Sequence, residues 1–246
     1  MRAKLHKFSI EISPTNDVSC IPKALRVFIR CLPSKHDLYQ LVAQANRCVQ
    51  QGIRPTAHIT ACHFNCKQDL IATLDSLYRV GCRSVLIMRG DQEPIGPFKN
   101  SIELLETGLF DAFEVGIVAD PEQTNDKNLA YKLARNSNIA FVVTQWCENK
   151  NKIQKLINWL QKPVYLGVPG LSSMRTMLSM ASRLNLQKVH TQLLSWHLSG
   201  DKIIESPKRF YDFLNQIDCL HIFSFNSLKQ DIYWIRNQVQ DVRLYD

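Results

Sequence analysis

The regular alternation of two sequence patterns constrains the fold of this 246-residue chain more than any other feature. Short apolar or alternating runs with β-branched residues predict strands, and such runs recur eight times. They cover residues 7–12, 26–32, 56–62, 84–88, 113–118, 139–144, 164–168 and 219–223. A repeating strand-then-helix order predicts parallel strands joined by right-handed crossovers. Eight such strands close most simply into an α/β fold of the (β/α)8 TIM barrel type.

Stretches with apolar residues at helical spacing separate or follow the predicted strands. They cover residues 37–50, 67–80, 101–106, 128–135, 152–161, 173–183 and 228–238, with an additional helix near 190–197. The alternative is an open doubly wound sheet, which would favour a glycine-rich phosphate-binding turn after the first strand. The segment from Ile12 to Asp17 contains no glycine, so the barrel is the favoured prediction.

The composition favours a single domain that spans residues 1–246. Hydrophobic residues make up 45% of the chain, which is enough to bury a substantial core at this length. No run approaches the roughly 18 consecutive apolar residues of a membrane span. The basic amino terminus leads into a short alternating strand rather than into the apolar core of a signal peptide. We therefore expect a cytoplasmic protein without membrane association.

The cysteines and the net charge argue against a metal-binding protein and against a nucleic-acid-binding protein. The eight cysteines are scattered, which predicts reduced and mostly buried thiols. Cys62, His63 and Cys66 lack a second ligand pair at zinc-like spacing, so we predict no metal site. The net charge of +8 comes from Lys and Arg residues spread along the chain without a long run. Anionic small ligands fit this pattern better than nucleic acid, and a generally basic surface is an equally good alternative.

Polar side chains gather at the carboxyl ends of the predicted strands, where barrel enzymes place their catalytic residues. Polar residues also occur at the strand ends of any barrel because these ends are exposed to water, so not every member of this set need be functional. Its members, in chain order, are Glu11, Arg30, His58, Arg89, Gly90, Asp91, Ala119, Asp120, Pro121, Glu122, Thr144, Gln145, residues 167–170, His221 and Asn226.

Glu11 and Asp91 are the leading catalytic candidates. Isoleucines flank Glu11, which predicts an apolar setting and a raised pKa suited to a general acid, although a solvated carboxylate is an equal alternative. Asp91 follows a glycine that permits close approach to a ligand, although a helix cap or an ion pair fits as well. His58 lies within a strand, where a histidine is more often a core residue. Gln145 offers an amide donor and acceptor for a heteroaromatic ring edge.

The ordered motifs resemble the methylenetetrahydrofolate reductase family, whose members are flavin-dependent (β/α)8 barrel enzymes of one-carbon metabolism. The resemblance covers nearly the whole chain and is closest to a divergent branch of the family. The matching segments are Phe8-Ser-Ile-Glu-Ile-Ser-Pro14, Thr56-Ala-His-Ile-Thr-Ala61, Leu86-Ile-Met-Arg-Gly-Asp91, Ala119-Asp-Pro-Glu122, Val143-Thr-Gln145, Gly167-Val-Pro-Gly170 and His221-Ile-Phe-Ser-Phe-Asn226.

This resemblance implies a reaction in which NADH or NADPH reduces FAD, and the reduced flavin then transfers hydride to the methylene carbon of a folate. Glu11 would be the general acid that opens the imidazolidine ring, and Asp91 the charge beside the flavin that can pair with the pterin. Gln145 and Thr144 would contact the folate. The positions implied to contact FAD are His58, Arg89, Gly90, Asp91, Ala119, Asp120, Asn128 and Lys132. A homo-oligomer is a further expectation.

The sequence departs from the family pattern where the flavin would lie. Asp120 stands where relatives have an aromatic residue or a histidine, and the usual histidine after Glu122 is replaced by Gln123-Thr124. These departures leave an alternative open, namely a barrel with little or no flavin. Such a barrel would bind folate as a non-catalytic partner protein or would transfer hydride directly from a nicotinamide.

Overall fold

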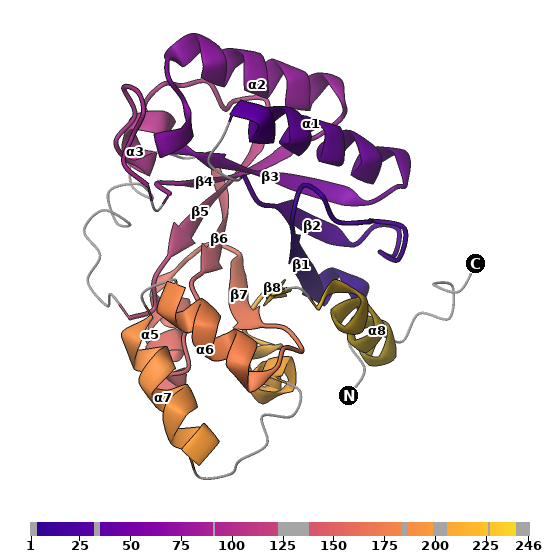
Figure 1. Ribbon diagram of the computed structural model, residues 1–246, viewed down its shortest axis with the longest axis vertical. Coiled ribbons are helices and arrows are strands. Elements are labelled where there is room, and N and C mark those ends of the chain that lie inside the picture. Colours follow the sequence, from indigo (N-terminus) through magenta and orange to yellow (C-terminus); the bar gives the residue numbers. More distant parts are fainter. Residues whose placement is uncertain are drawn as a thin grey trace.

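A computed structural model shows that the eight strands form a closed barrel in chain order, β1 to β8 (Figure 1). Every adjacent pair is parallel, including β8 with β1. The predicted (β/α)8 barrel is therefore confirmed. The structure describes residues 4–31, 35–90, 92–122, 138–183, 186–198, 206–225 and 227–239. The strands are β1 (Phe8–Ile12), β2 (Arg26–Ile29), β3 (Arg54–Thr60), β4 (Ser84–Met88), β5 (Glu114–Ala119), β6 (Ile139–Thr144), β7 (Val164–Pro169) and β8 (Cys219–Phe223).

The helices surround the barrel, with α1, α2 and α3 along one side and α5, α6 and α7 along the opposite side (Figure 1). The additional helix predicted near residues 190–197 is part of a longer helix, α7, and the helix predicted at 128–135 lies outside the described residues. The helices are α1 (Lys35–Gln50), α2 (Lys67–Arg79), α3 (Ser101–Leu105), α5 (Lys150–Trp159), α6 (Met174–Arg183), α7 (Gln187–Leu198) and α8 (Leu228–Gln238), with 3-10 turns η1 (Leu5–Lys7), η2 (Ala61–His63) and η3 (Ser206–Phe213).

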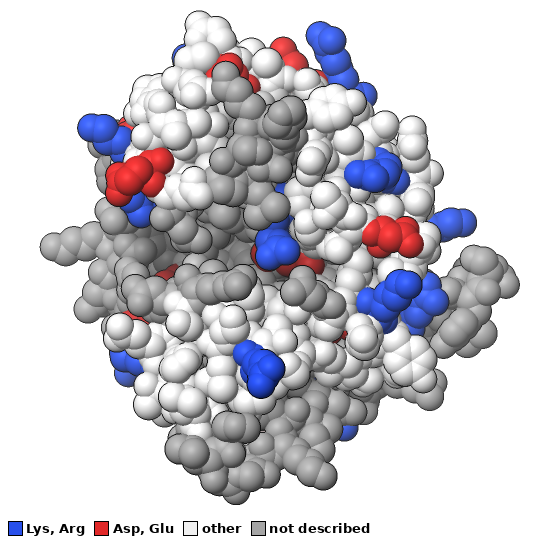
Figure 2. All heavy atoms as spheres, viewed as in Figure 1, with Lys and Arg blue, Asp and Glu red and all other residues white. Residues whose placement is uncertain are grey.

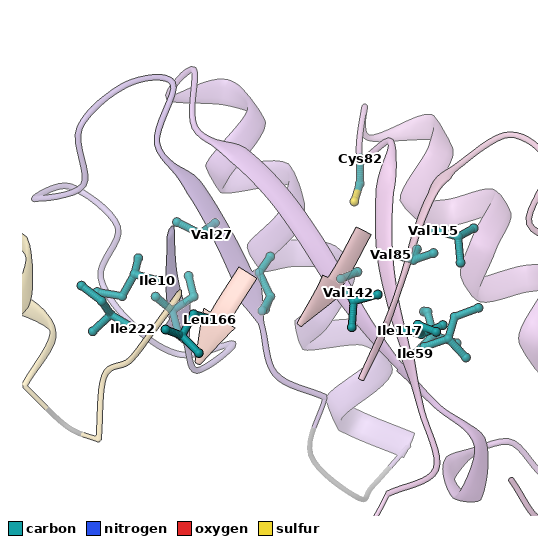
Figure 3. Close-up of a cluster of buried hydrophobic side chains, with 14 of the residues drawn as sticks. Ile10, Val27, Ile59, Cys82, Val85, Val115, Ile117, Val142, Leu166 and Ile222 are labelled. Atoms are coloured by element: carbon teal, nitrogen blue, oxygen red, sulfur yellow. The ribbon is translucent and has the colours of Figure 1, made fainter. Parts of the chain in front are cut away.

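Most apolar side chains of the strands point outward and form the main core against the helices, whereas Phe28, Leu86, Phe141 and Val143 form a smaller core inside the barrel. Figure 3 shows members of the outer core, including Ile10 and Ile222, which are paired in register on β1 and β8. Because successive strand residues face opposite sides of a sheet, the residues between these positions point into the barrel. The alternation of β1 therefore places Ser9 and Glu11 inside.

A buried arginine fills the barrel at the amino-terminal end of the strands. Arg26 on β2 donates hydrogen bonds to Thr56 on β3 (2.9 Å), to Ser84 on β4 and to Tyr165 on β7 (2.8 Å). Its guanidinium also forms a bidentate pair with Glu114 on β5, with N···O distances of 3.1 and 2.8 Å. One side chain therefore joins five strands, including its own.

No helix in the described ranges is both long and apolar enough to cross a membrane. The cytoplasmic location predicted from the sequence stays a prediction.

Candidate functional site

Glu11 lies near the carboxyl end of β1 and faces basic side chains from neighbouring strands. Its Oε1 is 3.7 Å from Nε of Arg30, which follows β2. Its Oε2 is 3.9 Å from Nε2 of His58 on β3 and 3.9 Å from Nε2 of His221 on β8. The side chain of Glu11 is 15% exposed. Closure of the barrel thus gathers a carboxylate, a guanidinium and two imidazoles that lie far apart in the sequence.

The pKa of Glu11 lies below its usual value. Burial raises the pKa of this carboxyl, but His221, His58 and Arg30 together lower it by more. The prediction of a raised pKa is therefore wrong, because the apolar neighbours of Glu11 in β1 point to the helices while the carboxylate faces basic groups inside the barrel. Glu11 is ionised at neutral pH, which suits a general base better than a general acid.

The two imidazoles present buried nitrogen atoms without hydrogen-bond partners. Nε2 of His58 and Nε2 of His221 have none within the described parts of the chain, since 3.9 Å to Glu11 is too long for a hydrogen bond. Burial lowers the pKa of His58 to about 4, although Glu11 opposes this shift. His58 is therefore neutral at pH 7. Phe28 packs against both rings, with centroid distances of 6.2 Å to His58 and 4.4 Å to His221.

More buried polar atoms without hydrogen-bond partners lie at the carboxyl ends of β2 and β3. They are Nε of Arg30 and Oγ1 of Thr60, again counted among the described residues. Buried polar atoms in native proteins nearly always have a hydrogen-bond partner, so each exception requires an explanation. Together with the two imidazole nitrogens, they lie at the same end of the barrel as Glu11, which is typical of a site that binds a polar ligand.

A cavity of about 140 Å³ lies beside Glu11 and is also lined by Ser13, Asn16, Arg30, Ser224, Phe225 and Leu228. Figure 2 shows a hollow near the middle of one face, with acidic atoms inside it and a basic side chain at its rim. On this face the described Lys and Arg side chains are scattered rather than gathered into one patch.

A larger cavity of about 270 Å³ lies at the amino-terminal end, where Arg26, Glu114 and Tyr165 line it. The guanidinium of Arg26 is already bound to the other two side chains, so these groups have a structural explanation. We therefore place the candidate site at the smaller cavity, where polar atoms lack partners.

The structure describes two of the three residues predicted to contact substrate. Thr144 is buried, and its Oγ1 accepts a hydrogen bond from the backbone N–H of Gly167 (2.9 Å). Gln145 is half-buried, and its backbone N–H donates to the carbonyl of Ala119 (2.7 Å). Asp91 lies outside the described residues, so the structure tests neither its catalytic nor its binding role.

The described residues among the predicted flavin contacts do not line either of the two cavities above, and one of them, His58, lies beside Glu11. Arg89 is exposed, and Ala119 is buried at the end of β5. Gly90 has a φ of +90°, and a Cβ there would overlap Cys62 and Thr60, so the glycine serves the backbone. Asp120 Oδ1 accepts from the N–H of Glu122 (2.9 Å).

Two other predicted flavin contacts, Asn128 and Lys132, lie outside the described residues, as does Asn226. Across the described ranges no group of three or more His, Cys, Asp or Glu residues is placed to hold a metal ion. All eight cysteines are free thiols.

Ser9 is a site residue that the sequence reasoning did not select. Its Oγ lies 3.0 Å from Nδ1 of His221 and 3.2 Å from Sγ of Cys219. The available signal was its position two residues before Glu11 on the same strand face. His221 and Arg30 were among the strand-end residues but had received no role, because only barrel closure shows that they face Glu11.

Comparisons with known proteins agree on the fold. No protein-family model matches the chain, and no curated protein matches it. A putative lyase/mutase from Burkholderia cenocepacia J2315 is similar in structure, with a TM-score of 0.51 and 10% identity over 93% of this chain and 80% of that chain. An oxaloacetate acetylhydrolase bound to oxalate has a TM-score of 0.48 and 12% identity, over 86% and 72% of the two chains.

A putative dihydrodipicolinate synthase family protein from Coccidioides immitis has a TM-score of 0.41 and 13% identity, over 73% of this chain and 65% of that chain. The chain spans 49% of the length of a similar conserved protein of unknown function from Enterococcus faecalis. Identities this low show a shared fold and no more.

The reductase function predicted from the sequence is corrected by these comparisons. The putative lyase/mutase, whose TM-score is 0.51, does not carry the name of a flavin-dependent reductase. No family model or curated protein connects the chain to methylenetetrahydrofolate reductases either. The folate-binding alternative rested on the same resemblance and loses its basis. Binding of FAD and of NADH or NADPH stays a prediction.

Proposed function

We propose that this protein is an enzyme that removes a proton from carbon next to a carbonyl group of a small substrate, with Glu11 as the general base. The observation that carries this proposal is the buried, ionised carboxylate of Glu11 facing the unpartnered Nε2 atoms of His58 and His221. A glutamate base beside a neutral histidine is a known solution for this chemistry, because the imidazole polarises the carbonyl oxygen while the carboxylate takes the proton.

The proposed step assigns each group a role. Glu11 accepts the proton, and the electron pair of the C–H bond becomes the carbon–carbon double bond of an enolate. Negative charge then develops on the carbonyl oxygen, and hydrogen bonds from His221 and the neutral His58 would stabilise it. Arg30 offers a fixed positive charge at the rim of the same cavity, which favours a substrate with an anionic group. Enolate formation of this kind is the common first step of many lyase and isomerase reactions.

Deuterium exchange tests this proposal without knowledge of the complete reaction. A panel of small aldehydes, ketones and 2-oxo acids is incubated with the protein in D₂O, and loss of the α-proton signal is followed by ¹H NMR. We expect exchange with at least one compound, and Glu11→Gln should slow it by about 100-fold or more, the usual effect of losing a general base.

Asp75→Asn is the matched control, since Asp75 is an exposed carboxylate on α2. Exchange by Glu11→Gln at the wild-type rate, or no exchange by the wild type with any compound, would contradict the proposed function.

A further inference from the structure

A continuous row of hydrogen bonds joins three buried side chains, and its last member faces Glu11. The three are Cys219, Ser9 and His221. Ser9 on β1 pairs in register with His221 on β8, and Cys219 lies two residues earlier on the same face of β8. Sγ of Cys219 is 3.2 Å from Oγ of Ser9, which is 3.0 Å from Nδ1 of His221. The exposed fractions of the three residues are 1%, 0% and 0%, so bulk water does not compete for these contacts.

The direction of the first hydrogen bond follows from the chemistry of the thiol. Burial raises the pKa of Cys219 to about 12, so the sulfur keeps its proton at neutral pH. The S–H group has two acceptors in reach, Oγ of Ser9 at 3.2 Å and the carbonyl of Leu220 at 3.6 Å. Since the hydroxyl oxygen is nearer, the thiol donates to Ser9.

The direction of the second hydrogen bond follows from which neighbour of Ser9 is the better acceptor. The hydroxyl of Ser9 has a single proton, and Nδ1 of His221 at 3.0 Å is a stronger acceptor than the protonated sulfur of Cys219 at 3.2 Å. If the hydroxyl donates to Nδ1, that nitrogen carries no proton, and a neutral imidazole must then carry its proton on Nε2. On the other side of the ring, Nε2 faces the negative Oε2 of Glu11 at 3.9 Å, which also favours a proton there.

We propose that Ser9 and Cys219 are positioning residues that hold His221 in the tautomer with its proton on Nε2. In this form His221 enters the site as a hydrogen-bond donor, able to bind a carbonyl or enolate oxygen, rather than as a base or a metal ligand. The part of this inference that concerns substrate rests on the proposed function. The tautomer itself is a property of the protein without substrate.

The tautomer can be measured directly in the intact 246-residue chain. Long-range ¹H–¹⁵N correlation spectra of ¹⁵N-histidine-labelled protein at neutral pH distinguish protonated from unprotonated ring nitrogens, and His221→Asn identifies the signals of His221. We expect the wild type to show protonated Nε2 and unprotonated Nδ1. In Cys219→Ala the Ser9 hydroxyl is free to rotate and accept from Nδ1, so signals of the other tautomer should appear. Cys219→Ser replaces the S–H donor by O–H and should restore the wild-type pattern.

Cys48→Ala provides the matched control, because Cys48 is also fully buried with a pKa raised to about 12, but it lies on α1. A wild-type spectrum with protonated Nδ1 would overturn the proposal, as would a Cys219→Ala spectrum identical to that of Cys48→Ala. Added Zn²⁺ should leave the His221 signals in place, and a shift typical of coordination at Nε2 would also overturn it. Failure of the deuterium exchange test alone would refute the enzyme function and leave the tautomer standing.

Discussion

His58 shows how a single buried side chain makes the stability of this protein depend on pH. Burial lowers the pKa of His58 from 6.5 to about 4 in the folded state. Between these two values the unfolded chain binds a proton that the folded chain does not bind. The free energy of unfolding is therefore unaffected by this group above pH 6.5 and falls as the pH drops from 6.5 toward 4.

We expect this loss to reach roughly 3 kcal/mol, since each pKa unit corresponds to about 1.4 kcal/mol. Urea unfolding followed at a series of pH values gives the slope, and His58→Gln should flatten it. The control is His190→Gln, which should keep the wild-type slope because His190 lies on the helix α7 and not on a barrel strand beside Glu11. An equal slope in wild type and His58→Gln would show that other groups control the acid response.

At the scale of elements, a small second core attaches α6 and α7 to the barrel. Trp146, which follows β6, is fully buried and packs with Met177, Val189 and Phe225. Its Nε1 donates a hydrogen bond to Oε1 of Glu148 (2.8 Å). This cluster is separate from the main core beneath the other helices, so the α6–α7 pair has its own source of stability.

We expect Trp146→Ala to destabilise the protein by about 3–5 kcal/mol, the usual cost of removing a large buried aromatic side chain. Hydrogen–deuterium exchange should increase in α6 and α7 more than in β1 to β5. Trp159→Ala on α5 is the matched control, because that side chain is 50% exposed and its removal leaves no buried cavity. Uniform loss of protection across the barrel would contradict a separate α6–α7 unit.

At the scale of the whole molecule, Arg26 joins five of the eight strands across the amino-terminal end of the barrel. Its side chain is 7% exposed, whereas that of its partner Glu114 is 40% exposed. Breaking a buried ion pair usually costs about 3–5 kcal/mol, and the exposure of Glu114 places this pair at the lower end of that range.

Arg26→Met should therefore lower the free energy of unfolding by about 3 kcal/mol in urea titrations. Lys150→Met removes an exposed pair with Asp212 (side chains 51% and 82% exposed) and should change it by less than about 0.5 kcal/mol. Similar effects of the two substitutions would show that the Arg26 network does not hold the barrel closed.

The order of strands and helices could be read from the chain because strand and helix periodicities are local. The ranges predicted for β4, β6, β8 and α8 agree with the structure at both ends. The strand predicted at 26–32 ends earlier, at Ile29, and the one predicted at 56–62 begins earlier, at Arg54, because end residues are set by pairing with neighbouring strands. The position of Glu11 near the end of a strand could also be predicted from the sequence.

Only the tertiary structure could decide which side chains surround the carboxylate of Glu11. Apolar residues around it in the sequence predict a raised pKa, yet Arg30, His58 and His221 surround its carboxylate and lower it. These partners belong to different strands, and His221 reaches Glu11 only because β8 pairs with β1 in one particular register. Local periodicity predicts which strand residues point into the barrel. The register of the closed barrel determines which of these side chains contact one another, and that register depends on packing along the whole chain.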